Sequence, residues 1–445
     1  MIAQLNFHNA HYSLTTTAIP WQISLLTSLK IRRFGQTGSN GLISYRIMDR
    51  LPAGIKDLPW PVEDDLQTPE TFPATDFGHQ PFDEGLIRAI AYAGPPYQGS
   101  PTRIFAYYGT PQGEGPFPAM VLIHGGGGTA FVEWVRLWNE RGYAALAMDT
   151  CGCIPVGGDG LVSRNNFSDS WQRHTWAGPP GWGGFSQADS PPDDHWMRHA
   201  SGAVVRGHSL LRSFPEIIPD RIGVTGVSWG GVLTCIAAGI DNRFAFAAPV
   251  YGCGFIGDCP AWKADFEQMG DQLATRWASL FDPAIFLRHA GMPFLWVNGT
   301  NDFAFTLPAW QRSYRTSPGS STLSLIVRMP HGHGGAGESP AEILAFAEHF
   351  LKEPAAPPLP SITSQGRDKD RVWVSWVSEF PIERAELNVT HDSAPWENRL
   401  WETVSVTPGI ERAETILPHG TLTYFWNIVD VRGLTVSTEH IDAQD

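Results

Sequence analysis

A serine set between a strand-like and a helix-like segment is the feature that most constrains the fold of this chain. Residues 226–230 read Gly-Val-Ser-Trp-Gly, a G-x-S-x-G pentad centred on Ser228, with apolar segments at 221–225 and 232–238 on either side. On a sharp strand-to-helix turn a serine hydroxyl is lifted out of the sheet, and the close packing there requires glycine at the flanking positions. The chain has 46 glycines, so the pentad alone could be a plain turn and other segments must decide.

Strand-like and helix-like segments alternate around the pentad. Short apolar runs typical of strands buried on both faces are followed by helical patterns. The predicted strands are 86–92, 103–108, 119–123, 144–149, 222–225, 246–250, 294–297 and 323–328, and the predicted helices are 130–141, 199–213 and 341–351. This alternation predicts an α/β fold with a mainly parallel central sheet.

Composition and period divide the 445 residues into regions, as expected for a chain too long for one ordinary core. We expect an N-terminal extension at 1–84 that packs on a catalytic domain at 85–352. A Pro-rich linker at 353–360 follows, and beyond it the apolar period changes from helical to twofold. Six strand-like segments predict a small C-terminal all-β sandwich of immunoglobulin or fibronectin type at 361–445: 371–377, 385–390, 400–406, 413–417, 422–428 and 434–438.

Charge and cysteine content exclude several classes of protein. The formal net charge is −14 without a basic run, which argues against a nucleic-acid or anionic-membrane partner. Five cysteines at irregular spacing form no disulfide framework, although a pair such as Cys253 and Cys259 could bridge in an oxidising compartment. No stretch is long and apolar enough to span a membrane, and residues 1–30 lack a signal-peptide pattern. We therefore expect a cytoplasmic protein, or a periplasmic or secreted one if a signal was removed before this numbering.

Acid and base candidates follow the pentad in the order Ser, acid, His that an α/β hydrolase uses. Asp302 comes just after the strand-like segment 294–297, and His331 and His333 come just after 323–328. Residues that follow successive parallel strands can converge on Ser228, where a base must take the hydroxyl proton and an acid must orient that base. We favour His333 as the base, because it lies further beyond the strand and Gly334 allows a close approach. His331 is the alternative base, and otherwise a substrate contact.

A glycine run supplies candidates for the oxyanion hole. The segment after the strand at 119–123 reads His-Gly-Gly-Gly-Gly, residues 124–128, and lacks the ending of a phosphate-binding loop. Backbone amides of Gly126, Gly127 and Trp229 are the expected oxyanion donors. His124 is a further candidate for substrate contact.

The long segment 151–199 is rich in Gly, Pro and Trp, and connections of this length inside a domain are usually functional. It follows a predicted strand, so we expect it to overhang the site. Its tryptophans suit sugar rings, with Trp182 and Trp196 as candidate substrate contacts; the alternative is that they pack the loop onto the core.

Taken in order, His-Gly-Gly-Gly-Gly, Gly-Val-Ser-Trp-Gly-Gly, Gly-Thr-Asn-Asp and Pro-His-Gly-His-Gly resemble the α/β-hydrolase superfamily. Over residues 85–352 they are similar to its dienelactone-hydrolase/prolyl-oligopeptidase-like branch, and within it to acetyl xylan esterases and related carbohydrate esterases. The resemblance implies an α/β-hydrolase fold and ester hydrolysis. Dienelactone hydrolases carry Cys at the position of Ser228, acetyl xylan esterases often carry Gln at that of Trp229, and prolyl oligopeptidases carry a propeller that 85 N-terminal residues cannot form.

The leading hypothesis is a serine carboxylesterase that cleaves acyl esters, in particular acetyl esters, of carbohydrates through an acyl-enzyme. The alternatives are a serine peptidase or amidase, and a non-catalytic binding protein. The expected partner is a small-molecule or carbohydrate ester, with no cofactor and no metal. The oligomeric state stays open, and a homo-oligomer is among the alternatives.

Overall fold

The computed structural model describes residues 58–77, 83–155, 171–181 and 185–443, all within one compact unit that spans 43–445. Its main feature is a 15-stranded sheet. Thirteen strands follow the order β1-β3-β4-β6-β5-β9-β10-β11-β12-β19-β18-β15-β16, and β2 and β20 pair with β3 and β18 beside this path. The strands from β6 to β12 in this order run parallel to one another, whereas β4 pairs antiparallel with both β3 and β6 at one end. The α/β part comprises β1 (Thr71–Phe72), β2 (Asp83–Glu84), β3 (Ile87–Ala93), β4 (Arg103–Gly109), β5 (Phe117–Ile123), β6 (Ala144–Met148), β9 (Ile217–Val227), β10 (Phe246–Val250), β11 (Phe294–Gly299) and β12 (Ser321–Ile326).

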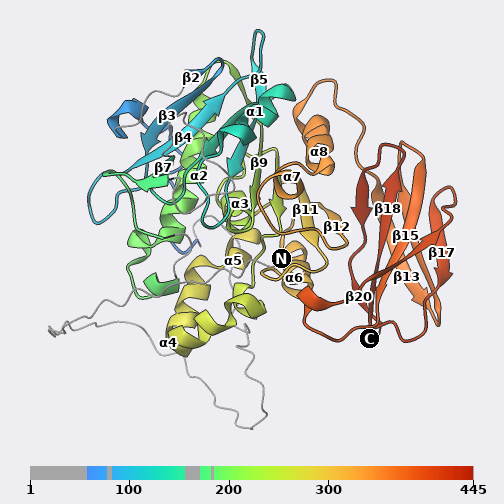
Figure 1. Ribbon diagram of the computed structural model, residues 1–445. Helices are drawn as coiled ribbons and strands as arrows, with labels where there is room; N and C mark the ends of the chain where they lie inside the picture. The colour runs from blue at the N-terminus through green and yellow to red at the C-terminus, as the bar shows by residue number, and fades with distance from the viewer. Residues whose placement is uncertain (1–57, 78–82, 156–170, 182–184, 444–445) are drawn as a thin grey trace. The chain divides into compact units, whose positions relative to one another are not determined.

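Helices cover both faces of this sheet because successive side chains of each strand point to opposite faces. In β5, Ala119, Val121 and Ile123 join one core, and Met120 and Leu122 join the other. The first core is covered by α2 (Trp196–Ser213), α3 (Trp229–Ile240), α4 (Lys263–Phe281), α5 (Pro283–Leu287) and α6 (Leu307–Thr316). The second is covered by α1 (Val132–Glu140) and α8 (Ala341–Leu351), and α7 (Gly335–Glu338) is a short helix between β12 and α8. Figure 1 shows α1 and α8 separate from the α2–α5 group.

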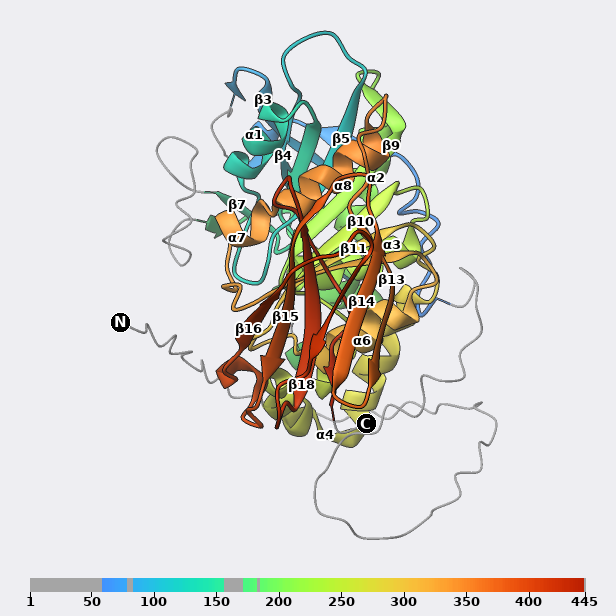
Figure 2. The ribbon, with the colours of Figure 1, turned by 90° about the vertical axis from the view of Figure 1, so that its right-hand side faces the viewer.

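The C-terminal strands form two antiparallel layers around a third core. One layer is β13-β14-β17, and the other is the β18-β15-β16 end of the large sheet. Alternate residues of β14, β15 and β18, such as Val374, Leu387 and Trp426, meet between them. Figure 2 shows β13, β14, β15 and β18 running alongside one another. The bounds are β13 (Ser361–Asp368), β14 (Arg371–Val377), β15 (Ile382–Thr390), β16 (Glu402–Val406), β17 (Arg412–Ile416), β18 (Thr423–Asp430), β19 (Thr435–Ser437) and β20 (Ile441–Asp442).

The α/β region and the C-terminal strands share one sheet. Leu323 of β12 pairs antiparallel with Ser437 of β19. The Ser437 hydroxyl accepts from the Leu325 amide at 2.7 Å, and the Asn427 side-chain amide donates to the Leu325 carbonyl at 3.2 Å. All eight residues of β18 are buried, because one face meets the sandwich core and Phe425 on the other face joins a core of the α/β region.

The predicted fold class is confirmed: a mostly parallel central sheet with helices on both faces, plus antiparallel β layers at the C-terminal end. Each predicted strand and helix falls on an observed one, but several observed elements were not predicted, among them β13, α4, α5 and α6. Most of the predicted N-terminal extension, namely 1–57 and 78–82, lies outside the described residues. All five cysteines are buried free thiols, so Cys253 and Cys259 form no bridge. Among the described helices, none is long and apolar enough to cross a membrane.

Candidate active site

Ser228 occupies the tight turn between β9 and α3, as the pentad predicts. Its backbone lies at φ 56° and ψ −119°, a conformation that non-glycine residues rarely adopt and that is typical of strained functional sites. A Cβ at Gly226 would overlap the Gly230 carbonyl oxygen, and a Cβ at Gly230 would overlap that of Ile123. Both glycines are therefore required by backbone contacts. The Ser228 amide donates to the Val250 carbonyl of β10 at 3.0 Å, which fixes the turn to the sheet.

His331 and Asp302 complete a chain of hydrogen bonds that starts at Ser228. Nε2 of His331 lies 2.9 Å from the Ser228 Oγ, and its Nδ1 lies 2.7 Å from the Asp302 Oδ2. A carboxylate only accepts, so Nδ1 carries the proton and Nε2 is left to accept from the serine hydroxyl. The other carboxylate oxygen of Asp302 accepts from the amides of Ala304 and Phe305 at 2.9 and 2.7 Å. These two amides hold the carboxylate in the orientation that His331 needs.

Aromatic rings surround the imidazole of His331. Tyr251 stacks on it with ring centroids 4.3 Å apart, and Phe305 lies nearly parallel to it at 6.4 Å. The Tyr251 hydroxyl donates to the Gly332 carbonyl and accepts from the Gly332 amide, so it also holds the backbone beside His331. Burial raises the pKa of Tyr251 well above its ordinary value, which keeps the phenol protonated as a donor.

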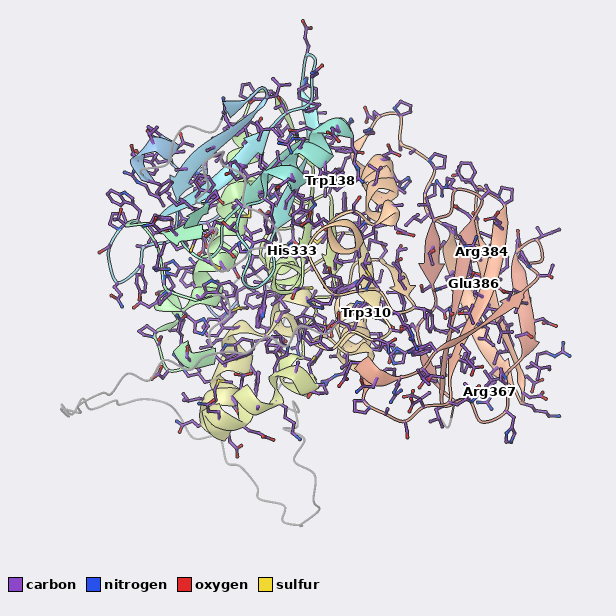
Figure 3. All side chains as sticks on the ribbon, viewed as in Figure 1. Trp138, Trp310, His333, Arg367, Arg384 and Glu386 are labelled. Atoms are coloured by element: carbon purple, nitrogen blue, oxygen red, sulfur yellow. The ribbon has the colours of Figure 1, made fainter. Side chains whose placement is uncertain are left out.

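The position beside Ser228 belongs to His331, which corrects our preference for His333. Nε2 of His333 instead accepts from the Gly125 amide at 3.0 Å, and its Nδ1 lies 3.2 Å from the Glu338 Oε1. His333 also packs against Phe131, with centroids 4.8 Å apart. Figure 3 labels it within the α/β region. Gly332, the one residue between the two histidines, carries the chain past Ser228, so His333 reaches the glycine loop instead of Ser228.

The glycine loop after β5 lies next to Ser228 and is held by two histidines. His333 accepts from the Gly125 amide, and Nδ1 of His124 donates to the Gly125 carbonyl at 2.8 Å. Nε2 of His124 accepts from the Thr150 amide at 3.0 Å, which sets this tautomer. His124 is only 3% exposed, and burial lowers its pKa, so it is a neutral brace of the loop and not the substrate contact that we expected.

These contacts narrow the set of oxyanion donors. The Gly125 amide is engaged by His333, and the Gly128 amide donates to the Gly125 carbonyl at 3.1 Å. Gly126 is exposed and Gly127 is partly exposed. Trp229 is the first residue of α3, so its amide lies at the N-terminal end of a helix, where the helix dipole favours negative charge. The geometry is thus compatible with Gly126, Gly127 and Trp229 as donors.

The tryptophans near the elbow pack the long loop onto the core. Trp196 is 1% exposed, donates to the Thr150 carbonyl at 2.8 Å and meets Trp229 edge to face. The Trp229 side chain is 2% exposed and also packs on Trp262. Trp196 therefore offers no surface to a substrate in this structure, which corrects its expected role. Trp182 lies outside the described residues.

Three residues of the site were not predicted from the sequence: Tyr251 and Phe303, whose rings pack against His331, and Glu338, which contacts His333. Tyr251 follows β10 directly, and residues that follow the ends of neighbouring parallel strands gather at one edge. That position is the signal that could have revealed it. Glu338 lies in the short helix α7, and Phe303 lies in the loop after β11. The sequence pattern does not specify the course of either segment.

Part of this chain matches the model of a known protein family. The model of the acetyl xylan esterase (AXE1) family matches residues 75–260. Acetyl esterase Axe7A of Xylanibacter ruminicola is 25% identical over 142 residues, which are 32% of this chain and 30% of the length of that esterase. The resemblance predicted from the motifs is therefore confirmed. The matched segment contains the glycine loop and Ser228 but ends before Asp302 and His331.

The solved structures that align with this chain include esterases and peptidases. The acetyl xylan esterase from Paenibacillus sp. R4 is 22% identical, with a TM-score of 0.48, over 66% of this chain and 100% of that chain. The acylaminoacyl peptidase of Pyrococcus horikoshii is 17% identical, with a TM-score of 0.43, over 64% of this chain and 43% of that chain.

Proposed function

Because residues 75–260 match the acetyl xylan esterase family, we propose that this protein is a serine esterase that removes acetyl groups from carbohydrates. Ser228 is the nucleophile, His331 the general base and acid, and Asp302 the residue that orients His331. The observation that carries the proposal is the continuous chain of hydrogen bonds from Ser228 Oγ through His331 to Asp302, at 2.9 and 2.7 Å.

Acylation follows from this geometry. Nε2 of His331 takes the hydroxyl proton as Oγ of Ser228 attacks the ester carbonyl carbon, and the carbonyl oxygen becomes an oxyanion. Amides of Trp229 and of Gly126 or Gly127 stabilise that charge. The tetrahedral intermediate then expels the sugar oxygen, which receives the proton from Nε2. The products of this half-reaction are the free sugar hydroxyl and an acetyl-Ser228 ester.

Deacylation repeats the same proton transfers with water. Nε2 of His331 takes a proton from water, whose oxygen attacks the acetyl carbonyl, and the collapse returns the proton to Oγ of Ser228. Acetate is released and the enzyme is restored. The Asp302 carboxylate, held by the amides of Ala304 and Phe305, stabilises the imidazolium in both half-reactions.

The test compares turnover of p-nitrophenyl acetate and of acetylated xylo-oligosaccharides by the wild-type protein and by Ser228→Ala. We expect Ser228→Ala to lose both activities, while Ser320→Ala, a change at an exposed serine, keeps them. Full activity of Ser228→Ala would overturn the nucleophile. Hydrolysis of an aminoacyl-nitroanilide with negligible ester turnover would instead establish an amidase or peptidase.

A further inference from the structure

A large aromatic side chain stands exposed beside His331. Phe303 is 54% exposed, and its ring centroid lies 4.9 Å from that of His331. The two other rings that contact His331, those of Tyr251 and Phe305, are fully buried. Among these three, Phe303 is thus the ring that a substrate can reach.

The loop that carries Phe303 is fixed on both sides of it. Asp302 accepts from the amides of Ala304 and Phe305, and both of those residues are buried. On the other side, the Asn301 side-chain amide points to three carbonyls of the C-terminal region, those of Trp396, Glu397 and Arg399, at 3.2, 3.2 and 2.8 Å. An exposed phenylalanine between two anchored segments is held in place by the loop, so its exposure is a property of the folded site.

The catalytic role of His331 determines which part of a substrate would meet this ring. Nε2 of His331 delivers its proton to the leaving oxygen, so the leaving alcohol must lie over His331 during acylation. Phe303 is exposed beside that imidazole, and it therefore flanks the space of the alcohol. An aromatic face is well matched to a pyranose ring, whose axial C–H groups form an apolar surface.

We propose that Phe303 forms a binding subsite for the leaving sugar of the ester. This inference rests on the proposed esterase function and adds the side of the site on which the carbohydrate is held. The subsite would act in only one of the two half-reactions. The sugar is bound during acylation, and it has left before water attacks the acetyl-enzyme.

The experiment uses two esters that share the acetyl group and differ in the alcohol: an acetylated xylo-oligosaccharide and ethyl acetate. We expect Phe303→Ala to lower kcat/KM for the oligosaccharide by about three- to tenfold, the effect of one aromatic contact, and to change that for ethyl acetate by less than about twofold. Phe303→Trp, which keeps an aromatic ring, should retain the oligosaccharide activity. The rate of hydrolysis of acetyl-Ser228, measured after rapid acetylation, should stay unchanged in both variants.

Ile410→Ala is the matched control, because Ile410 is 95% exposed and lies in the C-terminal region between β16 and β17. It should leave both activities unchanged. Equal losses for both esters in Phe303→Ala, or no loss for either, would overturn the subsite while leaving the esterase proposal intact. A wild-type protein that turns over neither ester would overturn both.

Discussion

Replacing each of the two neighbouring histidines tests the assignment of the catalytic base. His331 contacts Ser228 and Asp302, whereas His333 contacts Gly125 and Glu338. The two side chains therefore differ in what their loss removes. His331→Ala deletes the proton acceptor, and His333→Ala deletes only a support of the glycine loop.

The structure sets different magnitudes for these losses. Removal of the base of a serine triad lowers kcat by about 10⁴- to 10⁶-fold. Removal of His333 leaves the Gly125 amide without its acceptor, which costs about 1–3 kcal/mol. If all of that cost falls on the transition state, kcat falls by about 5- to 150-fold. His333→Gln should recover part of this loss, because its amide oxygen can accept from Gly125.

The assay is kcat for p-nitrophenyl acetate together with the rate at which a fluorophosphonate labels Ser228. His331→Ala should abolish both, and His333→Ala should reduce both by the smaller factor. Thermal unfolding of each variant shows whether the fold is kept. The reasoning fails if folded His333→Ala is as inactive as His331→Ala, or if His331→Ala keeps more than about one hundredth of the wild-type rate.

Three further predictions concern stability. Gly230→Ala places a Cβ against the Ile123 carbonyl and should lower the free energy of unfolding by about 2–3 kcal/mol in denaturant titrations; an unchanged value would contradict the packing argument. Burial lowers the pKa of His174 to about 4 from an ordinary 6.5, so the unfolded chain binds the proton first and stability falls by about 3 kcal/mol as pH drops from 6.5 to 4. His174→Phe should remove that share of the acid sensitivity, because phenylalanine does not bind a proton. The change breaks no hydrogen bond among the described residues, and an unaltered dependence of stability on pH would refute the prediction. Deletion of 361–445 uncovers the edge of β12 and should give aggregated protein by size-exclusion chromatography, whereas a soluble, active 1–360 chain would show that the C-terminal strands are dispensable.

The α/β part of the fold could be predicted from the sequence because its strands are buried on both faces and therefore read as short apolar runs. The run at 119–123 is β5, and the one at 246–250 is β10. β13 could not be predicted in this way, since its eight residues are all exposed or partly exposed. α4 was missed because Gly270, at φ 72°, interrupts its helical backbone, and few of its residues are buried.

Site residues could be predicted from the sequence where their position after a strand determines where they lie. Ser228 directly follows β9, and Asp302 lies three residues after the end of β11, so the edge of the sheet brings them together. The choice between His331 and His333 depends on the loop after β12, where Arg328 takes a positive φ of 56° and Tyr251 stacks on His331. Neither the backbone angle of Arg328 nor the ring contact of Tyr251 leaves a local signal in the sequence.

The connection between β12 and β19 gives the C-terminal strands a physical role in the α/β region. β12 would otherwise be the edge of the parallel sheet, with a row of unpaired backbone groups. It also leads into the loop of His331, so fraying of β12 would displace His331 relative to Ser228. Ser437 and Asn427 pair with the Leu325 backbone of β12, and Asn301 joins residues 396–399 to the loop of Asp302. His331 and Asp302, the proposed base and acid, thus lie on segments that the C-terminal strands hold, which gives those strands a mechanical role in the proposed site.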